Sequence, residues 1–182
     1  MRRTPNGIIP VVTTMLVALR SALVLVVVGF SSTPMAEDIQ DHAALAAALE
    51  HVKSTLEDGL RAGERIGKPI SAKFVLEHGT IQLSIWVTGE VGFAEFIVYP
   101  AIRTFSSNFD FRDPDKLEVA IARKLVMDKA TVSLLTATAD AVKANHGFRA
   151  ISAYPMLLDG NPIAVVTLLD ANTSKSVTEK LY

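Results

Sequence analysis

Residues 70–87 read ISAKFVLEHGTIQLSIWV, and this stretch determines the predicted fold class. Apolar and polar side chains alternate along both halves of the stretch, which is the period of a strand with one buried face. His78-Gly79 between the halves is typical of a hairpin turn. A third apolar run, Phe93 to Tyr99, ends at Pro100, where a strand ladder stops. The hairpin of residues 70–87 and this third run together predict a three-stranded antiparallel sheet.

Part of this pattern recurs near the end of the chain. Ile70-Ser71-Ala72 reappears as Ile151-Ser152-Ala153, and Gly79 recurs as Gly160 at the same spacing. This constant spacing, which we call the repeat offset, predicts a second copy of the module. Its strands are expected over 150–157, 163–169 and 175–181, with a turn at Asp159-Gly160-Asn161 and a loop at 170–174.

The second copy is predicted to differ from the first in two ways. Phe93-Ala94-Glu95 aligns with Val177-Thr178-Glu179 only if the repeat offset is enlarged, which would make the second loop three residues longer. The strand over 163–169 is apolar on both faces, because Ile163, Val165 and Leu169 alternate with Ala164, Val166 and Leu168. A strand of this kind is usually covered on both sides. We therefore expect it to be central or to meet the other copy.

Each set of strands follows a helical pattern. In the first copy, the apolar stripe is Leu45, Leu49, Val52, Leu56 and Leu60, and the helix is predicted to end at Arg65 to Gly67. In the second, Asp113-Pro114 is a predicted N-cap and first turn, before a stripe of Leu117, Ile121, Leu125, Val132, Leu135, Ala139 and Val142 that stops at Asn145-His146-Gly147. Asp128 interrupts this stripe, so the helix either bends there or Asp128 caps a separate helix.

Together these patterns predict an α+β fold of two tandem repeats. Each repeat is a helix followed by a three-stranded antiparallel sheet, with the helices packed on the sheets. The expected ranges are 37–104 for the first repeat, 105–128 for a linker loop and helix, and 129–182 for the second repeat.

Residues 1–36 are predicted to be a targeting segment. Residues 21–30 read SALVLVVVGF, a run that fits a signal-peptide core and is too short to span a bilayer. Translation starting at Met15 instead of Met1 would give a more compact signal. Cleavage is expected after Ala36, although Pro34 is unfavourable there, and the alternative is an uncleaved anchor. Both readings predict a periplasmic or secreted protein that meets a membrane only through this segment.

Composition excludes several functions. The net charge of -1 gives no basic footprint for nucleic acid, and the absence of cysteine excludes disulfides, thiolate zinc sites and a cysteine nucleophile. His42 and His51 are nine residues apart, about 180° around a helix, so they do not share a face. No Ser, His and acid fall into a known nucleophile motif. We expect no metal, no cofactor and no enzymatic activity.

The chain resembles the PepSY-domain proteins of bacteria over residues 45–182. The resemblance rests on strand and turn positions, namely 67–74 (GKPISAKF), 78–84 (HGTIQLS), 93–98 (FAEFIV), 147–150 (GFRA), 159–162 (DGNP) and 177–181 (VTEKL). Tyr99-Pro100-Ala101-Ile102-Arg103 departs from the family's usual Asp-x-x-Thr-Gly-like turn after the third strand, and the similar Asp170 to Ser174 follows the second strand instead. The resemblance implies a non-enzymatic envelope or extracellular module associated with restraint of peptidases.

Four aromatic residues are the predicted binding residues. Trp86 is expected on the outer face of the first sheet, and Phe105, Phe109 and Phe111 lie in the segment 99–111, which is a loop by composition. The alternative is structural: Trp86 packs against the neighbouring copy, and the three phenylalanines tuck beneath the sheet. Edge strands of small sheets can accept an extended peptide. The predicted function is therefore protein or peptide binding, with an exported peptidase or peptide as partner. A small exported enzyme with an unrecognised pocket and a passive envelope protein are the alternatives.

Overall fold

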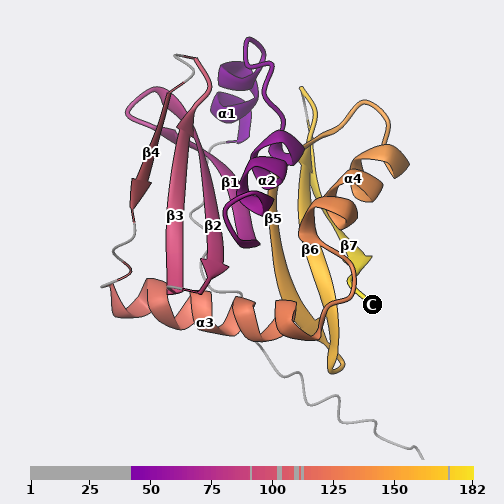
Figure 1. The fold of residues 1–182 in the computed structure, drawn as a ribbon. Helices are drawn as coiled ribbons and strands as arrows, with labels where there is room; N and C mark the ends of the chain where they lie inside the picture. Colours follow the sequence, from indigo (N-terminus) through magenta and orange to yellow (C-terminus); the bar gives the residue numbers. More distant parts are fainter. Residues whose placement is uncertain (1–41, 91, 102–103, 109–110, 112, 172) are drawn as a thin grey trace, which may run out of the picture. The chain divides into compact units, whose positions relative to one another are not determined.

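The computed structural model describes residues 42–182 apart from 91, 102–103, 109–110, 112 and 172. All described helices and strands belong to the unit 37–182. This unit is an α+β structure with one antiparallel sheet and helices (Figure 1). The predicted signal core, both candidate starts and the expected cleavage position lie outside the described residues. No helix within the described part of the chain is long and apolar enough to span a bilayer.

The described helices are α1 (His42–Leu49), α2 (Leu56–Glu64), α3 (Pro114–Lys129) and α4 (Leu134–Ala144). The strands are β1 (Lys68–Glu77), β2 (Thr80–Gly89), β3 (Gly92–Tyr99), β4 (Thr104–Asn108), β5 (Arg149–Leu158), β6 (Asn161–Leu169) and β7 (Ser174–Lys180). They form one seven-stranded sheet in the order β4-β3-β2-β1-β5-β6-β7. The predicted antiparallel strands are therefore present, but in a single sheet.

Both predicted hairpin turns are present. His78 and Gly79 have φ values of 47° and 75°, and Asp159 and Gly160 have 51° and 80°. Two successive left-handed residues give the turn that matches the twist of a two-residue hairpin. β3 ends at Tyr99, directly before Pro100, as predicted.

The sheet is continuous through its centre because β1 pairs with β5. The paired residues are Ala72 with Ala153 and Lys73 with Ser152. The strand that meets the other half is β5. Of the two alternatives expected for β6, it does not meet the other half, but it is an internal strand between β5 and β7. β6 is nevertheless buried on both faces, since Val166 and Leu168 are inaccessible on one and Leu169 is buried on the other. The covering elements are α4 on one side and α3 on the other.

The strand register corrects the alignment of the third strands. Trp86 pairs with Glu95, and at the unchanged repeat offset Thr167 pairs with Ser176. The enlarged offset is therefore wrong, because the second and third strands of the second half keep the register of the first half without the three inserted residues. Glu179 pairs with Ala164, so it does not correspond to Glu95.

The first helical stripe is interrupted, although its apolar spacing is regular. α1 ends at Leu49 and α2 begins at Leu56. Thr55 caps α2, because its hydroxyl accepts from the Asp58 N–H while the Asp58 carboxylate accepts from the Thr55 N–H, both at 3.1 Å. This reciprocal capping box starts a new helix where the stripe alone predicts continuation.

Asp113 caps α3 as predicted, but neither reading of Asp128 is right. α3 continues through Asp128, which pairs with Lys124 at 2.6 Å, and ends at Lys129. The next helix, α4, is capped by Ser133, whose hydroxyl accepts from the Thr136 N–H. α4 then ends at Ala144 with Asn145 as its C-cap, where the sequence predicted the stop.

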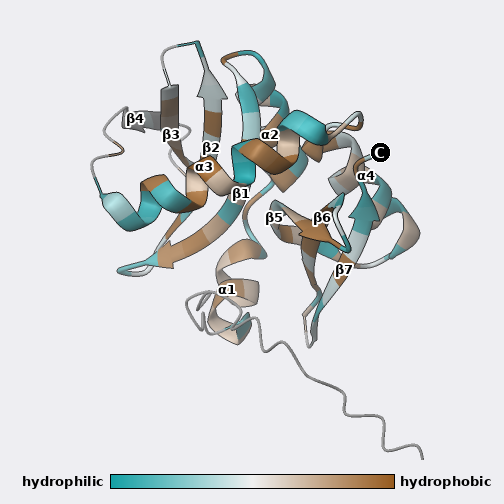
Figure 2. Ribbon diagram, turned by 90° about the horizontal axis from the view of Figure 1, so that it is seen from below, coloured by the Kyte–Doolittle hydropathy of each residue, from teal (hydrophilic) through white to brown (hydrophobic). Residues whose placement is uncertain are grey.

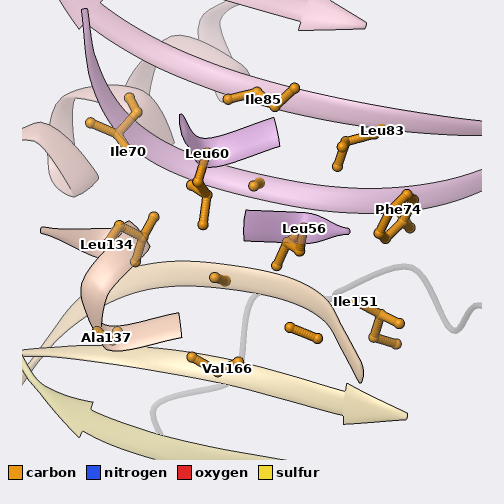
Figure 3. Close-up of a cluster of buried hydrophobic side chains, with 14 of the residues drawn as sticks. Leu56, Leu60, Ile70, Phe74, Leu83, Ile85, Leu134, Ala137, Ile151 and Val166 are labelled. Atoms are coloured by element: carbon orange, nitrogen blue, oxygen red, sulfur yellow. The ribbon is translucent and has the colours of Figure 1, made fainter. Parts of the chain in front are cut away.

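The core lies between the sheet and the pair α2 and α4. Leu56 and Leu60 from α2 face Leu134 and Ala137 from α4 over the buried strand residues (Figure 3). Gly59 and Gly63 lie on the side of α2 that contacts the sheet. Cβ atoms there would lie within 3.4 Å of side chains from Leu83, Ile85 and Val87. We call the sheet face that carries these three residues the inner face, and its opposite the outer face.

The segment 99–111, predicted as a loop, contains a strand. Thr104–Asn108 forms β4, which pairs with β3 at one edge of the sheet. Its sequence, TFSSN, is mostly polar because an edge strand with solvent on one side needs little apolar character. Local composition therefore missed it.

Candidate interaction surfaces

Trp86 lies in an aromatic cluster on the outer face. Its neighbours Ile85 and Val87 face α2, so the alternation of the strand turns the indole away from the core. The Phe111 ring meets Trp86 edge-on, with 5.1 Å between ring centroids and an interplanar angle of 88°. Phe93 lies 5.8 Å from Phe111. This T-shaped arrangement is a favoured geometry for aromatic pairs.

The helix α3 runs across the strands of the sheet (Figure 1), and its Arg123 lies against this cluster. The Arg123 guanidinium lies 5.4 Å from the Trp86 ring and 4.9 Å from the Tyr154 ring, bridging β2 and β5. Nearer the start of α3, Lys116 pairs with Glu95 at 3.5 Å. Trp86 is consequently half-buried beneath its own chain and is not an open platform for a partner.

The four predicted binding residues have different placements. Trp86 and Phe111 come together, as just described. Phe105 lies in β4 opposite Val98, but its side chain is outside the described part of the structure, as is the whole of Phe109. The described geometry therefore assigns Trp86 and Phe111 to packing between α3 and the sheet.

Replacing Trp86 with alanine is expected to lower the free energy of unfolding by about 1.5 kcal/mol, because it removes a half-buried ring with two specific contacts. Trp86→Phe should lose much less, since an aromatic ring remains beneath Arg123. Urea unfolding followed by circular dichroism measures both. An unchanged unfolding midpoint for the alanine variant would show that the ring does not hold α3.

Exposed apolar side chains gather at the end of β5. Met156, Leu157 and Leu158 are 40%, 41% and 50% exposed, directly before the Asp159-Gly160 turn. We call these three residues the hairpin tip. Three consecutive exposed apolar residues are unusual unless they have a function. The sequence carried a signal for them, because the strand pattern loses its alternation just before the turn.

The helix α3 also exposes apolar side chains. Ile121 and Leu125, predicted to be buried, are 45% and 59% exposed, whereas Ala120 and Met127 are buried. The prediction of the buried stripe is wrong because α3 turns a different side toward the sheet. That side carries Ala120, Val126 and Met127, which are buried, together with Lys116 and Arg123, which contact Glu95 and Trp86.

The described residues present no evident site for chemistry. They contain no group of three or more His, Asp or Glu side chains placed to hold a metal ion. A shallow hollow of about 250 Å³ lies between α2, the start of β1 and the α3–α4 connection. Its ionisable lining residues are Glu64 and Lys68, and the Lys68 amine donates to the Met127 carbonyl at 2.8 Å. The hollow does not bring an acid and a base together around a nucleophile.

Arg149 is a partly buried cation that connects distant parts of the chain. Burial lowers the pKa of its guanidinium, and the nearby charge of Glu57 partly opposes this. The guanidinium donates to the carbonyls of Leu49 at 2.8 Å and Ser54 at 3.0 Å, and lies 5.5 Å from the Phe74 ring centroid. Arg149 thus holds the α1–α2 connection, a structural role that sequence analysis did not detect.

No family model matches the chain, and no curated protein resembles it significantly in sequence. Among solved structures, it resembles a Clostridium difficile 630 protein provisionally described as a lipoprotein. The TM-score is 0.41 at 9% sequence identity, with 74% of this chain and 90% of that chain covered. A likeness this weak carries no functional argument, and the PepSY resemblance stays a prediction.

Proposed function

We propose that this protein is an exported, non-enzymatic interaction module that binds another protein through its hairpin tip. The main observation that supports this proposal is the run of Met156, Leu157 and Leu158, each at least 40% exposed on a hydrogen-bonded hairpin. Full burial of one such side chain contributes about 1.5–3 kcal/mol. A partner that covers the three residues gains several kcal/mol from a hairpin already ordered in the free protein.

The tip is a better docking element than the aromatic cluster. Trp86 and Phe111 already contact each other and Arg123, so a partner would have to displace α3 to reach them. The tip residues instead end at a tight turn, where Leu158 pairs with Asn161. A short, rigid apolar finger of this kind fits a cleft on a partner.

The partner we propose is an exported peptidase. Peptidase clefts bind extended chain segments, and the resemblance to PepSY proteins implies restraint of peptidases. The apolar run at 21–30 supports export to the periplasm or the medium. The module acts by occupying the cleft and takes no part in chemistry.

We further propose that the two halves of the sheet are copies of one module. Support comes from features that recur at the repeat offset: bulges at Pro69/Ser71 and Ala150/Ser152, the two left-handed turns, and the pairing of Ala72 with its counterpart Ala153. Lys68 and Arg149 also occupy equivalent positions at the repeat offset. Each donates to a backbone carbonyl at or near the end of a helix that lies far away in the sequence: Lys68 near the end of α3, and Arg149 at the end of α1.

The test replaces the tip residues together with threonine, which keeps the tendency to form a strand while removing apolar surface. Affinity capture from an exported-protein extract, followed by peptidase assays on the captured proteins, compares this variant with the wild type. The control is Ile66→Thr, since Ile66 is 55% exposed but lies after α2, outside the tip. We expect the wild type and the control to capture and inhibit the same peptidase and the tip variant to lose it by more than about tenfold. Equal capture by all three proteins would exclude the tip, and no specific partner for any of them would favour a passive envelope role.

A further inference from the structure

Among the residues that the structure describes, the second edge of the sheet has no counterpart of the strand that covers the first edge. By the repeat offset, β7 (Ser174–Lys180) corresponds to residues 93–99 of β3. β3 is covered by β4, but among the described residues no strand pairs with the side of β7 that points away from β6. The N–H and C=O groups on that side of β7 are a template for another strand.

The sequence of β7 is complementary to itself when two copies run antiparallel. If the pairing is centred on Val177, then Lys175 of each copy lies opposite Glu179 of the other, and Ser176 lies opposite Thr178. Lys175, Val177 and Glu179 alternate along the strand and so share one face. Two Lys–Glu pairs thus flank a Val–Val pair, and opposite charges placed directly across two strands attract.

The centred register is the one that forms both Lys–Glu pairs. Moving the pairing by one residue, so that Val177 lies opposite Thr178, places Lys175 opposite Lys180 of the other copy, and like charges directly opposite each other destabilise a strand pair. Moving it the other way, so that Val177 lies opposite Ser176, places Lys175 opposite Thr178 and Glu179 opposite Ser174, which removes both Lys–Glu pairs.

The charged groups are available for this pairing. Within the described part of the chain, Lys175 and Glu179 form no salt bridge. The Lys175 amine lies 4.1 Å from the Phe148 ring centroid, a contact that leaves its charge unneutralised. Lys175 is exposed and Glu179 half-buried. Figure 2 shows the hydrophilic character of β7 beside the apolar β6.

We propose that this protein forms a two-fold symmetric dimer in which β7 of one copy pairs with β7 of a second copy. The interface is isologous, since the same strand serves both subunits. Pairing of seven edge residues buries less than the roughly 1,200 Å² of a standard stable interface. The dimer is therefore weak and depends on concentration. The dimer interface is a different surface from the hairpin tip, so the dimer and the proposed function are tested independently of each other.

Charge reversal tests the dimer. Sedimentation equilibrium of the full chain over a range of concentrations is expected to show a monomer–dimer equilibrium. Lys175→Glu places Glu opposite Glu179 twice, and Glu179→Lys places Lys opposite Lys175 twice, so each should weaken dimerisation by at least about tenfold. The double variant Lys175→Glu/Glu179→Lys restores both pairs in reverse and should dimerise like the wild type.

Two controls separate a loss of the dimer from a loss of folding. Circular dichroism of the single variants should match the wild type, because each replaces a strand residue that lies outside the core. The threonine variant of the hairpin tip should dimerise normally. A monomer at all concentrations, single reversals without effect, a double variant that is not restored, or a tip variant that loses the dimer would each overturn the proposal.

Discussion

Replacing Arg149 with alanine lowers the free energy of unfolding by about 3 kcal/mol, the largest effect we expect from a single truncation outside the apolar core. The guanidinium donates to the carbonyls of Leu49 and Ser54, with a longer contact of 3.4 Å to Val52. Those carbonyls lie at the end of α1 and on the approach to α2, and the Leu49 carbonyl also accepts from the Val52 N–H at 3.1 Å. Each polar group left buried without a partner costs about 1–3 kcal/mol. Guanidine denaturation followed by circular dichroism measures the change.

Two controls separate hydrogen bonding from charge at this position. Arg149→Lys keeps the positive charge, but the lysine amine lacks the planar guanidinium that donates to several carbonyls at once. This variant should therefore regain only part of the free energy of unfolding that Arg149→Ala loses. Lys68→Ala, at the corresponding position of the first half, removes a single bond to the Met127 carbonyl and should cost about 1 kcal/mol. If Arg149→Ala unfolds at the same denaturant concentration as the wild type, the proposed clamp on α1 and α2 is wrong.

Replacing Gly67 with alanine lowers the free energy of unfolding by about 2 kcal/mol, within the range expected for overpacking at a position that cannot relax. A Cβ atom at this position would lie 2.6 Å from the Thr88 carbonyl oxygen. Because that oxygen belongs to the backbone of β2, the clash cannot be relieved by rotating a side chain. Gly67 is required where the chain passes from α2 into β1 against β2. Thermal unfolding measured by calorimetry gives the loss.

Gly89 offers the matched control. It also lies at a strand end, but a Cβ atom there would meet nothing within 4 Å and its φ is not in the left-handed region. Gly89→Ala should therefore leave the unfolding temperature nearly unchanged. Equal destabilisation by both substitutions would mean that strand-end flexibility, and not the contact with Thr88, makes Gly67 necessary.

The strands could be predicted from the sequence because their evidence is local. Alternation along β1 and β2 and the His78-Gly79 turn sufficed, and β5 and β6 followed from the recurrence of this pattern at the repeat offset and from the turn at Asp159-Gly160. β4 could not be predicted, because an edge strand with a polar sequence carries no alternation. The break at 50–55 had a local signal in the Thr55 and Asp58 capping box, but the regular spacing of leucines outweighed it.

The candidate surfaces were harder to predict because they depend on which elements cover which face. The outward orientation of Trp86 followed from strand alternation, yet nothing in the local sequence indicated that Arg123 and Phe111 would cover it. The stripe of Ile121 and Leu125 was assigned to the core on the assumption that the more apolar side of a helix is buried. In the structure, the side of α3 that is buried instead carries Ala120, Val126 and Met127.

The most direct test of the proposed function is photo-cross-linking from the hairpin tip. A photoreactive amino acid in place of Leu158 in the full chain, activated in the native exporting cell, should form a covalent adduct with one exported peptidase. The same group in place of Ile66, which is similarly exposed, should form none. An adduct from position 66 identical to that from position 158, or no adduct from position 158, would contradict binding through the tip.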